Sequence, residues 1–393
     1  MSYWRELIFP AAMLLAAGSA SATPTATSCT HLVNLKLPHT TITSARLVRA
    51  GKFVLPPDSS PPSSDFFTAF DKLRSFCRVE GISQPSSDSQ IEFEVWLPQA
   101  DWNGKYEGAG NGGFGGSINF YRLAEAVNAG YAGSSTDTGH KGTSGEVNWA
   151  TGHREKIIDF GYRAIHETAE ITKAIISAYY GKPPTRSYFS SCSNGGRQGL
   201  MEAQRYPDDY DGILAGAPTN PGVLSSSASG VRATNDKTAV NLNASNPNLK
   251  PFEQRGGKLI IFHGENDGPL LTIKYYENVV STLDAEHTNK FIQLYVVPGM
   301  GHCEGGPIAG DFGQRLSPKD DPQHSILVAL EQWVERGTAP ENIIATKYKI
   351  DGVRESGVVR TRPICPYPQT ATFSGSGSAD EAVNYSCTAP RKK

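Results

Sequence analysis

The sequence predicts an α/β fold in which a mostly parallel sheet is flanked by helices. Short apolar runs typical of buried strands alternate with segments whose apolar residues recur at helical spacing. Such alternation favours a parallel sheet with helices on both faces, because each crossover between parallel strands needs a helix-sized connection. No internal repeat occurs, and 393 residues suffice for one large core. Ligand sites in such sheets lie beyond the carboxyl ends of the strands.

The N-terminus has the composition of a secretory signal peptide. A short apolar run over 10–20 ends in Ala-Ser-Ala at 20–22, which fits a cleavage site. The charged part before it is weak, because Glu6 offsets Arg5. The alternative is a membrane anchor, for which the run is short. We therefore expect residues 1–22 to be removed and the protein to be secreted, either to the periplasm or outside the cell.

The remaining segments are assigned in chain order. Residues 23–89 are rich in Pro and Ser and are expected to be irregular, wrapping the main domain. The pattern sharpens with the alternating run IEFEVWL, which predicts a strand. Strands are predicted over 91–97, 131–136, 187–190, 212–217, 258–263 and 291–297. Helices are predicted over 123–129, 159–180, 199–205 and 325–335. The long second helix is expected to stop at Gly181, because two prolines follow closely.

Charge and composition exclude several classes of function. The formal net charge is −2, and no basic stripe or run of five like charges occurs, so nothing favours binding to nucleic acid. No stretch after the N-terminal run is long and apolar enough to span a membrane, and no C-x-x-C or H-x-x-x-H spacing favours zinc. We expect neither a metal nor a cofactor.

The segment 191–197, SCSNGGR, lies between a predicted strand and a predicted helix. A serine on such a sharp turn presents its hydroxyl above the edge of the sheet, as in the G-x-S-x-G elbow of hydrolases. Gly195 and Gly196 supply the small neighbours that a tight turn needs. The pattern departs from G-x-S-x-G at Ser191, where glycine is usual. The alternative is an ordinary glycine-rich turn, and we take Ser193 as the candidate nucleophile.

Two later loops supply the partners that a serine nucleophile needs. The sequence Gly-Glu-Asn-Asp after the run at 258–263 ends at Asp267, and His302 follows the run at 291–297. The order serine, acid, histidine is that of α/β-hydrolases. We expect His302 to take the serine proton and Asp267 to orient the imidazole. Glu265 is the rival acid, and each of these residues taken alone also fits an ordinary turn or loop.

Donors for the negative charge of a tetrahedral intermediate are expected from two places. One is the backbone N–H of Asn194, directly after the serine. The other is Gly112 and Gly113, in the glycine-rich stretch 106–116, where the backbone can approach a substrate closely. Glycine-rich loops also bind dinucleotides, but no G-x-G-x-x-G opens a helix here. The stretch therefore favours an oxyanion hole.

Six cysteines behind a signal peptide indicate disulfides. Cys192 adjoins Ser193 and Cys303 adjoins His302, so a convergent triad would bring these cysteines close and a bond between them would fix the loops. The alternative is that Cys192 is a reactive nucleophile, against which the even number of cysteines argues. The natural remaining pairs, each closing a local loop, are Cys29–Cys77 and Cys365–Cys387.

The chain resembles the tannase and feruloyl esterase family of α/β-hydrolases over nearly the whole mature sequence. The matching motifs are GNGGFGG (110–116), STDTGH (135–140), DFGYRAIHE (159–167), the stretch 192–218, RGGKLIIFHGENDG (255–268), VVPGMGHCEGG (296–306) and RPICPYPQ (362–369). The resemblance implies that Ser193, Asp267 and His302 form the triad and that Cys192–Cys303 is the disulfide beside it. It also implies hydrolysis of aromatic-acid esters, such as galloyl or feruloyl esters, and some relatives act on aromatic polyester fragments.

One departure from the resembled family concerns its lid. In the family a large lid domain follows the strand that ends near Ala217, covers the active site, shapes the acid pocket and carries a calcium site. Here about 30 residues fill the gap, and no D-x-D-type run of oxygen ligands occurs in them, so calcium is not expected. We treat 219–250 as a remnant lid within a single catalytic domain, 23–393. The acid loop is also shortened after Gly268.

Two functions are kept open. The first is a secreted serine esterase that forms an acyl-enzyme on Ser193 with small aromatic esters, derived from plant cell walls or tannins. The second is a catalytically impaired or non-enzymatic binding protein on the same scaffold, because the lid is truncated. A protease or lipase on this fold is a lesser rival. The sequence does not specify the ester, because the residues that would select it lie in the shortened region.

Overall fold

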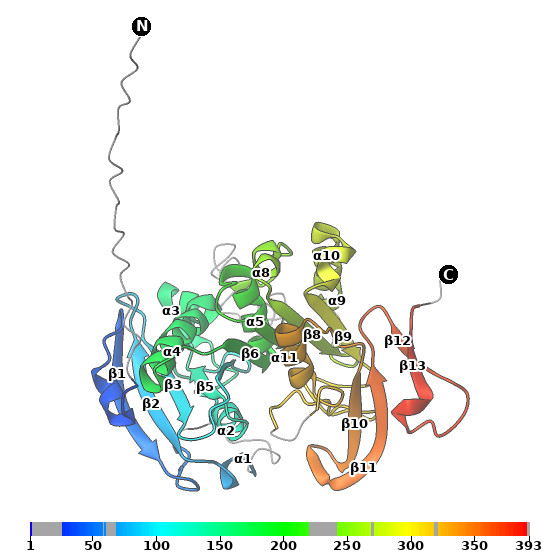
Figure 1. Cartoon of the computed structure of the whole chain (residues 1–393), viewed down its shortest axis with the longest axis horizontal. Coiled ribbons are helices and arrows are strands. Elements are labelled where there is room, and N and C mark those ends of the chain that lie inside the picture. Colours follow the sequence, from blue (N-terminus) through cyan, green and yellow to red (C-terminus); the bar gives the residue numbers. More distant parts are fainter. Residues whose placement is uncertain are drawn as a thin grey trace.

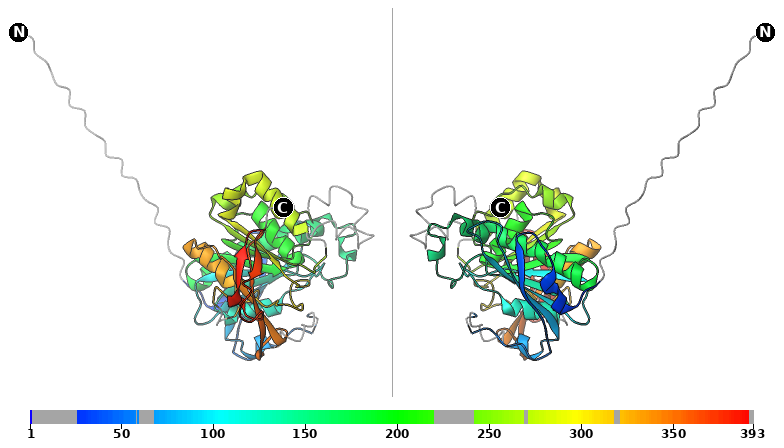
Figure 2. Two further views of the ribbon diagram at one scale, coloured as in Figure 1. Left: turned by 90° about the vertical axis from the view of Figure 1, so that its right-hand side faces the viewer. Right: turned by 90° about the vertical axis from the view of Figure 1, so that its left-hand side faces the viewer.

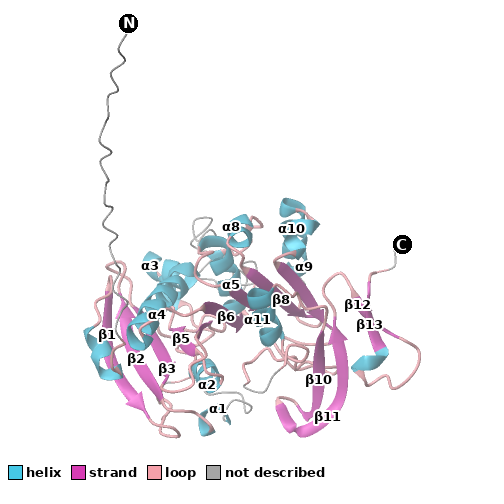
Figure 3. Ribbon diagram, viewed as in Figure 1, coloured by secondary structure: helices cyan, strands magenta, loops and turns pink. Residues whose placement is uncertain are grey.

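A nine-stranded sheet forms the centre of this computed structural model, which describes Met1 and residues 26–57, 59, 68–219, 242–268, 271–317 and 321–390. The strands lie in the order β1-β2-β3-β5-β4-β6-β7-β8-β9 (Figures 1 and 3). They are β1 (Thr40–Val48), β2 (Phe76–Ser83), β3 (Ile91–Pro98), β4 (Lys105–Ala109), β5 (Ala132–Thr136), β6 (Arg186–Cys192), β7 (Gly212–Gly216), β8 (Lys258–Gly264) and β9 (Ile292–Val297). Neighbours from β5 to β9 pair in parallel, whereas β1, β2, β3 and β5 pair antiparallel. The sheet is therefore mostly parallel, as predicted.

Helices cover both faces of this sheet. They are α1 (Thr68–Asp71), α2 (Phe120–Asn128), α3 (Arg154–Ile158), α4 (Ala164–Tyr180), α5 (Asn194–Arg205), α8 (Lys250–Gln254), α9 (Leu271–Leu283), α10 (Ala285–Asn289) and α11 (Ile326–Arg336). Apolar side chains of α4, α5, α8 and α9 form one core with the strands. On the opposite face, those of α11 form a second core, and most of those of α2 form a third with Phe76 and Trp96. Strands enclosed in this way become apolar along their whole length, and every residue of β7 is buried.

Residues 23–89 are more regular than the sequence analysis expected. Their described part contains a 3₁₀ helix, η1 (Cys29–Asn34), and the strands β1 and β2. The prediction that this stretch only wraps the domain is wrong, because β1 and β2 form the antiparallel edge of the main sheet. In β1 only Ile42 is buried. The usual alternation of a half-buried strand is therefore absent from this edge, and no period was recognisable in the sequence.

Several helix boundaries differ from the prediction, and α2 begins at Phe120, three residues before the predicted start. The segment 159–180 begins with one π-helical turn, η4 (Asp159–Arg163), which joins α3 to α4. The helix predicted over 199–205 begins five residues earlier, at Asn194. Glycine disfavours a helix start on propensity alone, but here Gly195 and Gly196 are needed because other atoms occupy the positions of their missing side chains. Tertiary packing has overridden local propensity at this point.

The C-terminal part adds two hairpins that were not predicted. They are β10 (Ile343–Ile350) with β11 (Val353–Ile364), and β12 (Thr370–Phe373) with β13 (Tyr385–Thr388), which a short 3₁₀ helix, η6 (Ala382–Asn384), precedes. They lie at the end of the molecule away from β1 and face the viewer in the left view of Figure 2. The disulfide Cys365–Cys387 ties the end of the first hairpin to the second.

Several expectations fall on residues that the structure does not describe. The expected signal peptide at 1–22 lies outside the described residues except for Met1, and so does 220–241 of the expected lid remnant. The rest of that remnant packs onto the domain, since Leu242, Ala244 and Leu249 are buried. Among the described residues, no helix has the length and apolar character that crossing a bilayer requires.

Candidate active site

Three side chains that are far apart in the sequence meet at the carboxyl edge of the sheet. The Ser193 Oγ lies 2.8 Å from the His302 Nε2, and the His302 Nδ1 lies 2.7 Å from the Asp267 Oδ2. Ser193 follows β6, Asp267 follows β8 and His302 follows β9. Hydroxyl, imidazole and carboxylate are thus connected in series, the arrangement in which an imidazole can take a serine proton and a carboxylate can orient that imidazole.

The turn that carries Ser193 is sharply bent. Its φ of 65° and ψ of −126° lie in a region that non-glycine residues rarely adopt. The turn is held to the neighbouring strand, because the Ser193 N–H donates to the Gly216 carbonyl at 2.9 Å. A Cβ on Gly196 would lie 2.1 Å from the same carbonyl oxygen, so only glycine allows α5 to start this close to β7. This hydrogen bond and the close packing at Gly196 hold the strained turn, so that the Ser193 hydroxyl stays above the edge of the sheet.

Ser191, the departure from the usual elbow pattern, fits because its neighbours lack side chains. A Cβ on Gly195 would lie 1.9 Å from the Ser191 Oγ, and a Cβ on Gly110 would lie 2.9 Å from the Ser191 Cβ. The space that glycine at position 191 usually leaves is therefore supplied by two other glycines. The elbow closes in this chain without its first glycine.

Asp267, and not its rival Glu265, contacts the histidine. The Glu265 carboxylate accepts the backbone N–H of Gly299 at 3.0 Å. His263, a buried residue of β8, lies behind Asp267: its Nε2 is 3.0 Å from the Asp267 carbonyl oxygen. Because the Asp267 carbonyl oxygen can only accept, the His263 Nε2 carries the proton of this bond, and the Nδ1, 2.8 Å from the Thr272 hydroxyl, can accept from that hydroxyl. His263 of β8 thus holds the loop that carries Asp267 in place.

The residues expected to form the oxyanion hole lie around the serine in different ways. Gly112 and Ser193 border the same cavity, and a Cβ on Gly112 would meet no atom within 4 Å. Gly113 has a φ of 56° and packs against Ser144, whose backbone oxygen a Cβ would approach to 2.6 Å. Asn194 is fully buried at the start of α5. Gly112 of the glycine-rich loop therefore lies at the cavity that Ser193 borders, and the oxyanion-hole role of Asn194, Gly112 and Gly113 stays a prediction.

A buried histidine that sequence reasoning missed holds this loop. The His140 ring lies flat against Trp149, and its Nε2 is 2.8 Å from the Phe114 carbonyl oxygen of the loop. Burial lowers the pKa of His140 to about 4, so the ring is neutral at neutral pH and the Nε2 donates its proton to the loop. Its signal in the sequence was its place at the end of the STDTGH motif.

A second missed residue is Arg197, which is fully buried on α5. Its Nε donates to the Asn194 Oδ1 at 2.8 Å, and its two terminal nitrogens donate to the carbonyls of Gly161 at 2.8 Å and Phe160 at 3.1 Å. These carbonyls belong to the π-helical turn, a feature frequent at functional sites. Arg197 therefore fixes the first residue of α5, directly after the nucleophile.

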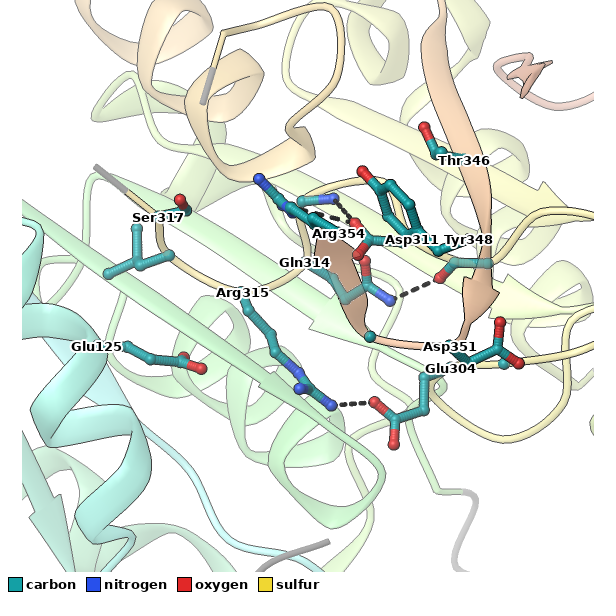
Figure 4. Close-up of a pocket in the computed structure, with 15 residues that line it drawn as sticks. Glu125, Glu304, Asp311, Gln314, Arg315, Ser317, Thr346, Tyr348, Asp351 and Arg354 are labelled. Carbon is teal, nitrogen blue, oxygen red and sulfur yellow. Dashed lines mark hydrogen bonds and ion pairs between the residues drawn. The ribbon is translucent and has the colours of Figure 1, made fainter. Parts of the chain in front are cut away.

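A cavity bordered by Ser193 lies at the triad, and a second cavity adjoins the first. The site cavity, of about 650 Å³, is bordered by Ser193 and the glycine-rich loop together with Ile118, Phe120, Tyr121, Leu214 and Phe262. The side cavity, of about 280 Å³, is lined mainly by polar residues, including Asp311, Thr346, Tyr348 and Arg354 (Figure 4). Both cavities share Glu304, Gln314 and Arg315. Groups of three or more His, Cys, Asp or Glu side chains that could hold a metal ion do not occur among the described residues.

All six cysteines are paired. The bonds are Cys192–Cys303, Cys29–Cys77 and Cys365–Cys387, which are the pairs expected from the sequence. Cys192 is therefore not a free thiol. The first of these disulfides also borders the site cavity and joins the residue before Ser193 to the residue after His302. It ties the nucleophile loop directly to the histidine loop.

Comparison with known proteins extends this picture. The family model described as "Tannase and feruloyl esterase" matches residues 77–241 and 220–388. An uncharacterised esterase of Xanthomonas campestris is 32% identical over 95% of this chain and 92% of that protein. A probable feruloyl esterase B-2 of Neosartorya fischeri is 26% identical over 90% of this chain and 94% of that protein.

Solved structures show the same fold. Feruloyl esterase B from Aspergillus oryzae superposes with a TM-score of 0.78 at 22% identity, over 92% of this chain and 99% of that chain. Tannin acyl hydrolase from Aspergillus niger superposes with a TM-score of 0.66 at 20% identity, over 90% of this chain and 92% of that chain. The α/β-hydrolase fold that the sequence predicted is confirmed.

The relatives are longer than this chain. The alignment with the Xanthomonas esterase runs over 547 positions, and because this chain has 393 residues, at least 154 of them have no counterpart here. The two segments that the family model matches meet at 220–241. A shortened insertion after β7 fits both observations and stays a prediction. With its family model matched over most of its length and esterases among its relatives, the chain belongs to the tannase and feruloyl esterase family and is a carboxylic ester hydrolase.

Proposed function

We propose that this hydrolase cleaves esters of phenolic or aromatic acids through an acyl-enzyme on Ser193. The observation that carries the proposal is the continuous contact from the Ser193 Oγ to the His302 Nε2, at 2.8 Å, and from the His302 Nδ1 to Asp267, at 2.7 Å. His302 is half exposed, so a substrate can reach the atom that must exchange protons.

The reaction follows from this geometry in two halves. The Ser193 oxygen attacks the ester carbonyl carbon while the His302 Nε2 takes its proton, and the carbonyl oxygen becomes negative. The N–H groups of Asn194 and of Gly112 or Gly113 stabilise that charge. The bond to the leaving oxygen then breaks, and the imidazolium returns its proton to the departing alcohol.

The acyl group, now on Ser193, is removed by the same residues. The neutral His302 takes a proton from a water molecule as the water oxygen attacks the acyl carbon. The bond to the serine oxygen breaks, the imidazolium protonates that oxygen, and the carboxylic acid leaves. Asp267 is not protonated in either half, because its role is to orient the imidazole and stabilise its positive form.

The substrate class is supported by the relatives and by the cavity. The named relatives include feruloyl esterases and a tannin acyl hydrolase, so feruloyl and galloyl esters are the first candidates. The site cavity presents the aromatic rings of Phe120, Tyr121 and Phe262 beside Ser193, which favours a flat acyl group. Small esters from plant cell walls or tannins carry such groups.

We also infer that the protein is secreted. The composition of residues 1–22 is that of a signal peptide, and three disulfides form and persist in oxidising compartments. The rival function is a non-catalytic binding protein on this scaffold. The observation that favours the rival is the absence of at least 154 positions present in the Xanthomonas alignment.

A fluorophosphonate probe separates the two functions. We expect the folded protein to be labelled at Ser193 and the Ser193→Ala variant to remain unlabelled. Hydrolysis of methyl ferulate, methyl gallate and methyl butyrate is measured with the same samples, and the variant is expected to lose turnover by several orders of magnitude. Folded wild-type protein that neither reacts with the probe nor cleaves any of the three esters would establish the binding-protein alternative.

A further inference from the structure

An ion pair at the boundary between the two cavities has no part in the reaction described above. Glu304 and Arg315 form a direct contact, and both residues border the site cavity and the side cavity (Figure 4). The two side chains remain accessible, with 47% of Glu304 and 26% of Arg315 exposed. A molecule that fills the site cavity can therefore reach both charged groups.

Both residues are held by fixed surroundings. Glu304 follows Cys303, which is bonded to Cys192. On the other side of the pair, the Gln314 side chain donates to the Gly310 carbonyl at 2.8 Å and accepts the Phe312 N–H at 3.0 Å. The backbone of that loop also pairs with β10 through Asp311. The backbone segments that carry the ion pair are thus held before a ligand arrives, which lowers the entropy lost on binding.

The chemistry of the pair defines what it can recognise. A carboxylate beside a guanidinium offers one acceptor and one set of donors, and a neutral hydroxyl group can donate to the first and accept from the second. An anionic ligand fits less well, because each arginine that borders the site cavity already has a carboxylate partner: Arg315 pairs with Glu304, and Arg122 pairs with Glu107 and Glu125. The pair therefore favours a ligand that carries a neutral hydroxyl group at this position over a ligand that carries a carboxylate or is unsubstituted there.

The position of the site cavity indicates which half of the ester occupies it. The leaving oxygen must lie next to the His302 Nε2, which protonates it. Ser193 and the glycine-rich loop border the site cavity, whereas His302 does not border it. The group that enters this cavity is therefore the acyl group, and Glu304 and Arg315 lie in the wall of the cavity that it enters.

We propose that Glu304 and Arg315 form a subsite that binds a phenolic hydroxyl at the far end of the aromatic acyl group. This inference rests on the proposed function and adds the residues that select the substrate. They belong to the catalytic domain itself and lie between β9 and α11, so the subsite includes none of the described residues of the expected lid remnant.

The test compares substrates within each protein. Methyl 4-hydroxycinnamate, methyl 4-carboxycinnamate and methyl cinnamate differ only at the far end of the acyl group, and 2-hydroxyethyl cinnamate and ethyl cinnamate differ only in the alcohol. We measure kcat/KM at about pH 6, where phenols are neutral. The selectivity is the kcat/KM ratio of each substituted ester to its unsubstituted partner, which cancels general effects on the active site.

We expect wild type to prefer the 4-hydroxy ester over both other cinnamates, and Arg315→Gln and Glu304→Gln each to lower the hydroxy selectivity by about tenfold or more. Arg354→Gln is the matched control, because Arg354 pairs with Asp311 in the side cavity and does not border the site cavity. Its selectivity should equal that of wild type.

Three results would overturn the subsite. They are an unchanged hydroxy selectivity in both variants, an equal loss in Arg354→Gln, and a preference of wild type for the 4-carboxy ester. A selectivity change confined to the alcohol series would likewise refute the acyl assignment. If wild type cleaves none of the five esters, the proposed function itself has failed, which is distinct from cleavage without selectivity.

Discussion

Removing the Cys192–Cys303 disulfide tests whether the bond holds the catalytic geometry or only stabilises the chain. The perturbation is the double variant Cys192→Ala/Cys303→Ala, which needs no reductant and leaves the other two disulfides intact. Each cysteine adjoins a triad residue, so its loss frees the Ser193 turn from the His302 loop. The matched control is Cys365→Ala/Cys387→Ala, in the C-terminal hairpins.

The stability change follows from the length of chain that each bond closes. The two active-site cysteines are 111 residues apart, which corresponds to a chain-entropy stabilisation of about 5 kcal/mol. The control pair is 22 residues apart, which corresponds to about 3 kcal/mol. Domains of this kind are stable by about 5–15 kcal/mol. Both losses are at or below the lower end of this range, so both variants should still be folded below room temperature. Both should unfold at a lower urea concentration than wild type.

The activity change should differ between the two variants. The Ser193 Oγ and His302 Nε2 lie 2.8 Å apart, and a displacement of about 1 Å in a catalytic contact costs about 10²-fold in rate. We therefore expect the active-site variant to lose about 10²-fold in kcat/KM while folded, whereas the control keeps the wild-type value.

The assay pairs urea unfolding, followed by circular dichroism, with kcat/KM for methyl ferulate at a temperature where each variant is folded. The proposed positioning role of the disulfide is refuted if the active-site variant loses stability but keeps kcat/KM within about twofold of wild type. An equal loss of activity in the control would also refute it, because that loss would reflect stability and not the site.

Three further predictions follow from single side chains. Asp267→Asn should lower kcat by about 10³–10⁴-fold by destabilising the imidazolium, whereas Glu265→Gln should cost less than about tenfold; equal losses would contradict the assignment of the acid. For His140, the folded-state pKa of about 4 lies below the ordinary 6.5, so the unfolded chain takes up the proton first as pH falls. Relative to His140→Phe, wild type should lose up to about 3 kcal/mol of unfolding free energy as the pH falls from about 6.5 to 4, measured by urea titration at each pH. Parallel curves of unfolding free energy against pH for the two proteins would contradict this. Gly196→Ala should abolish most activity, measured as kcat in folded protein, because its Cβ would lie 2.1 Å from a backbone carbonyl oxygen of β7; Gly145→Ala, where no atom lies within 4 Å, is the control and should be neutral.

Most strands of the parallel sheet, though not β4, and the three candidate catalytic residues were readable from the sequence because their signals are local. A buried parallel strand is apolar along its whole length, so runs such as KLIIFH stand out against polar loops. The position of a functional loop directly after such a strand then places it at one edge of the sheet. That is why Ser193, Asp267 and His302 could be named together before their contacts were seen.

Features that depend on contacts between distant segments were not readable in the same way. The long hairpin strand β11 and the edge strand β1 lack a clean alternation, because little of either face is buried. Likewise, the role of Arg197 depends on the carbonyls of a π-helical turn more than thirty residues away in sequence. No pattern within either segment signals that pairing.

By itself, the sequence determined the fold class, the order of the candidate catalytic residues and the family, since each is encoded in local periodicity or in a contiguous motif, whereas the cysteine pairs were settled only by the structure. Only the tertiary structure decided that Asp267 and not Glu265 faces the histidine, and that Ser191 can replace glycine. It also decided that Glu304 meets Arg315 beside the nucleophile. Side-chain directions and the space between segments arise only when the chain is packed, because they are set by neighbours that are remote in sequence.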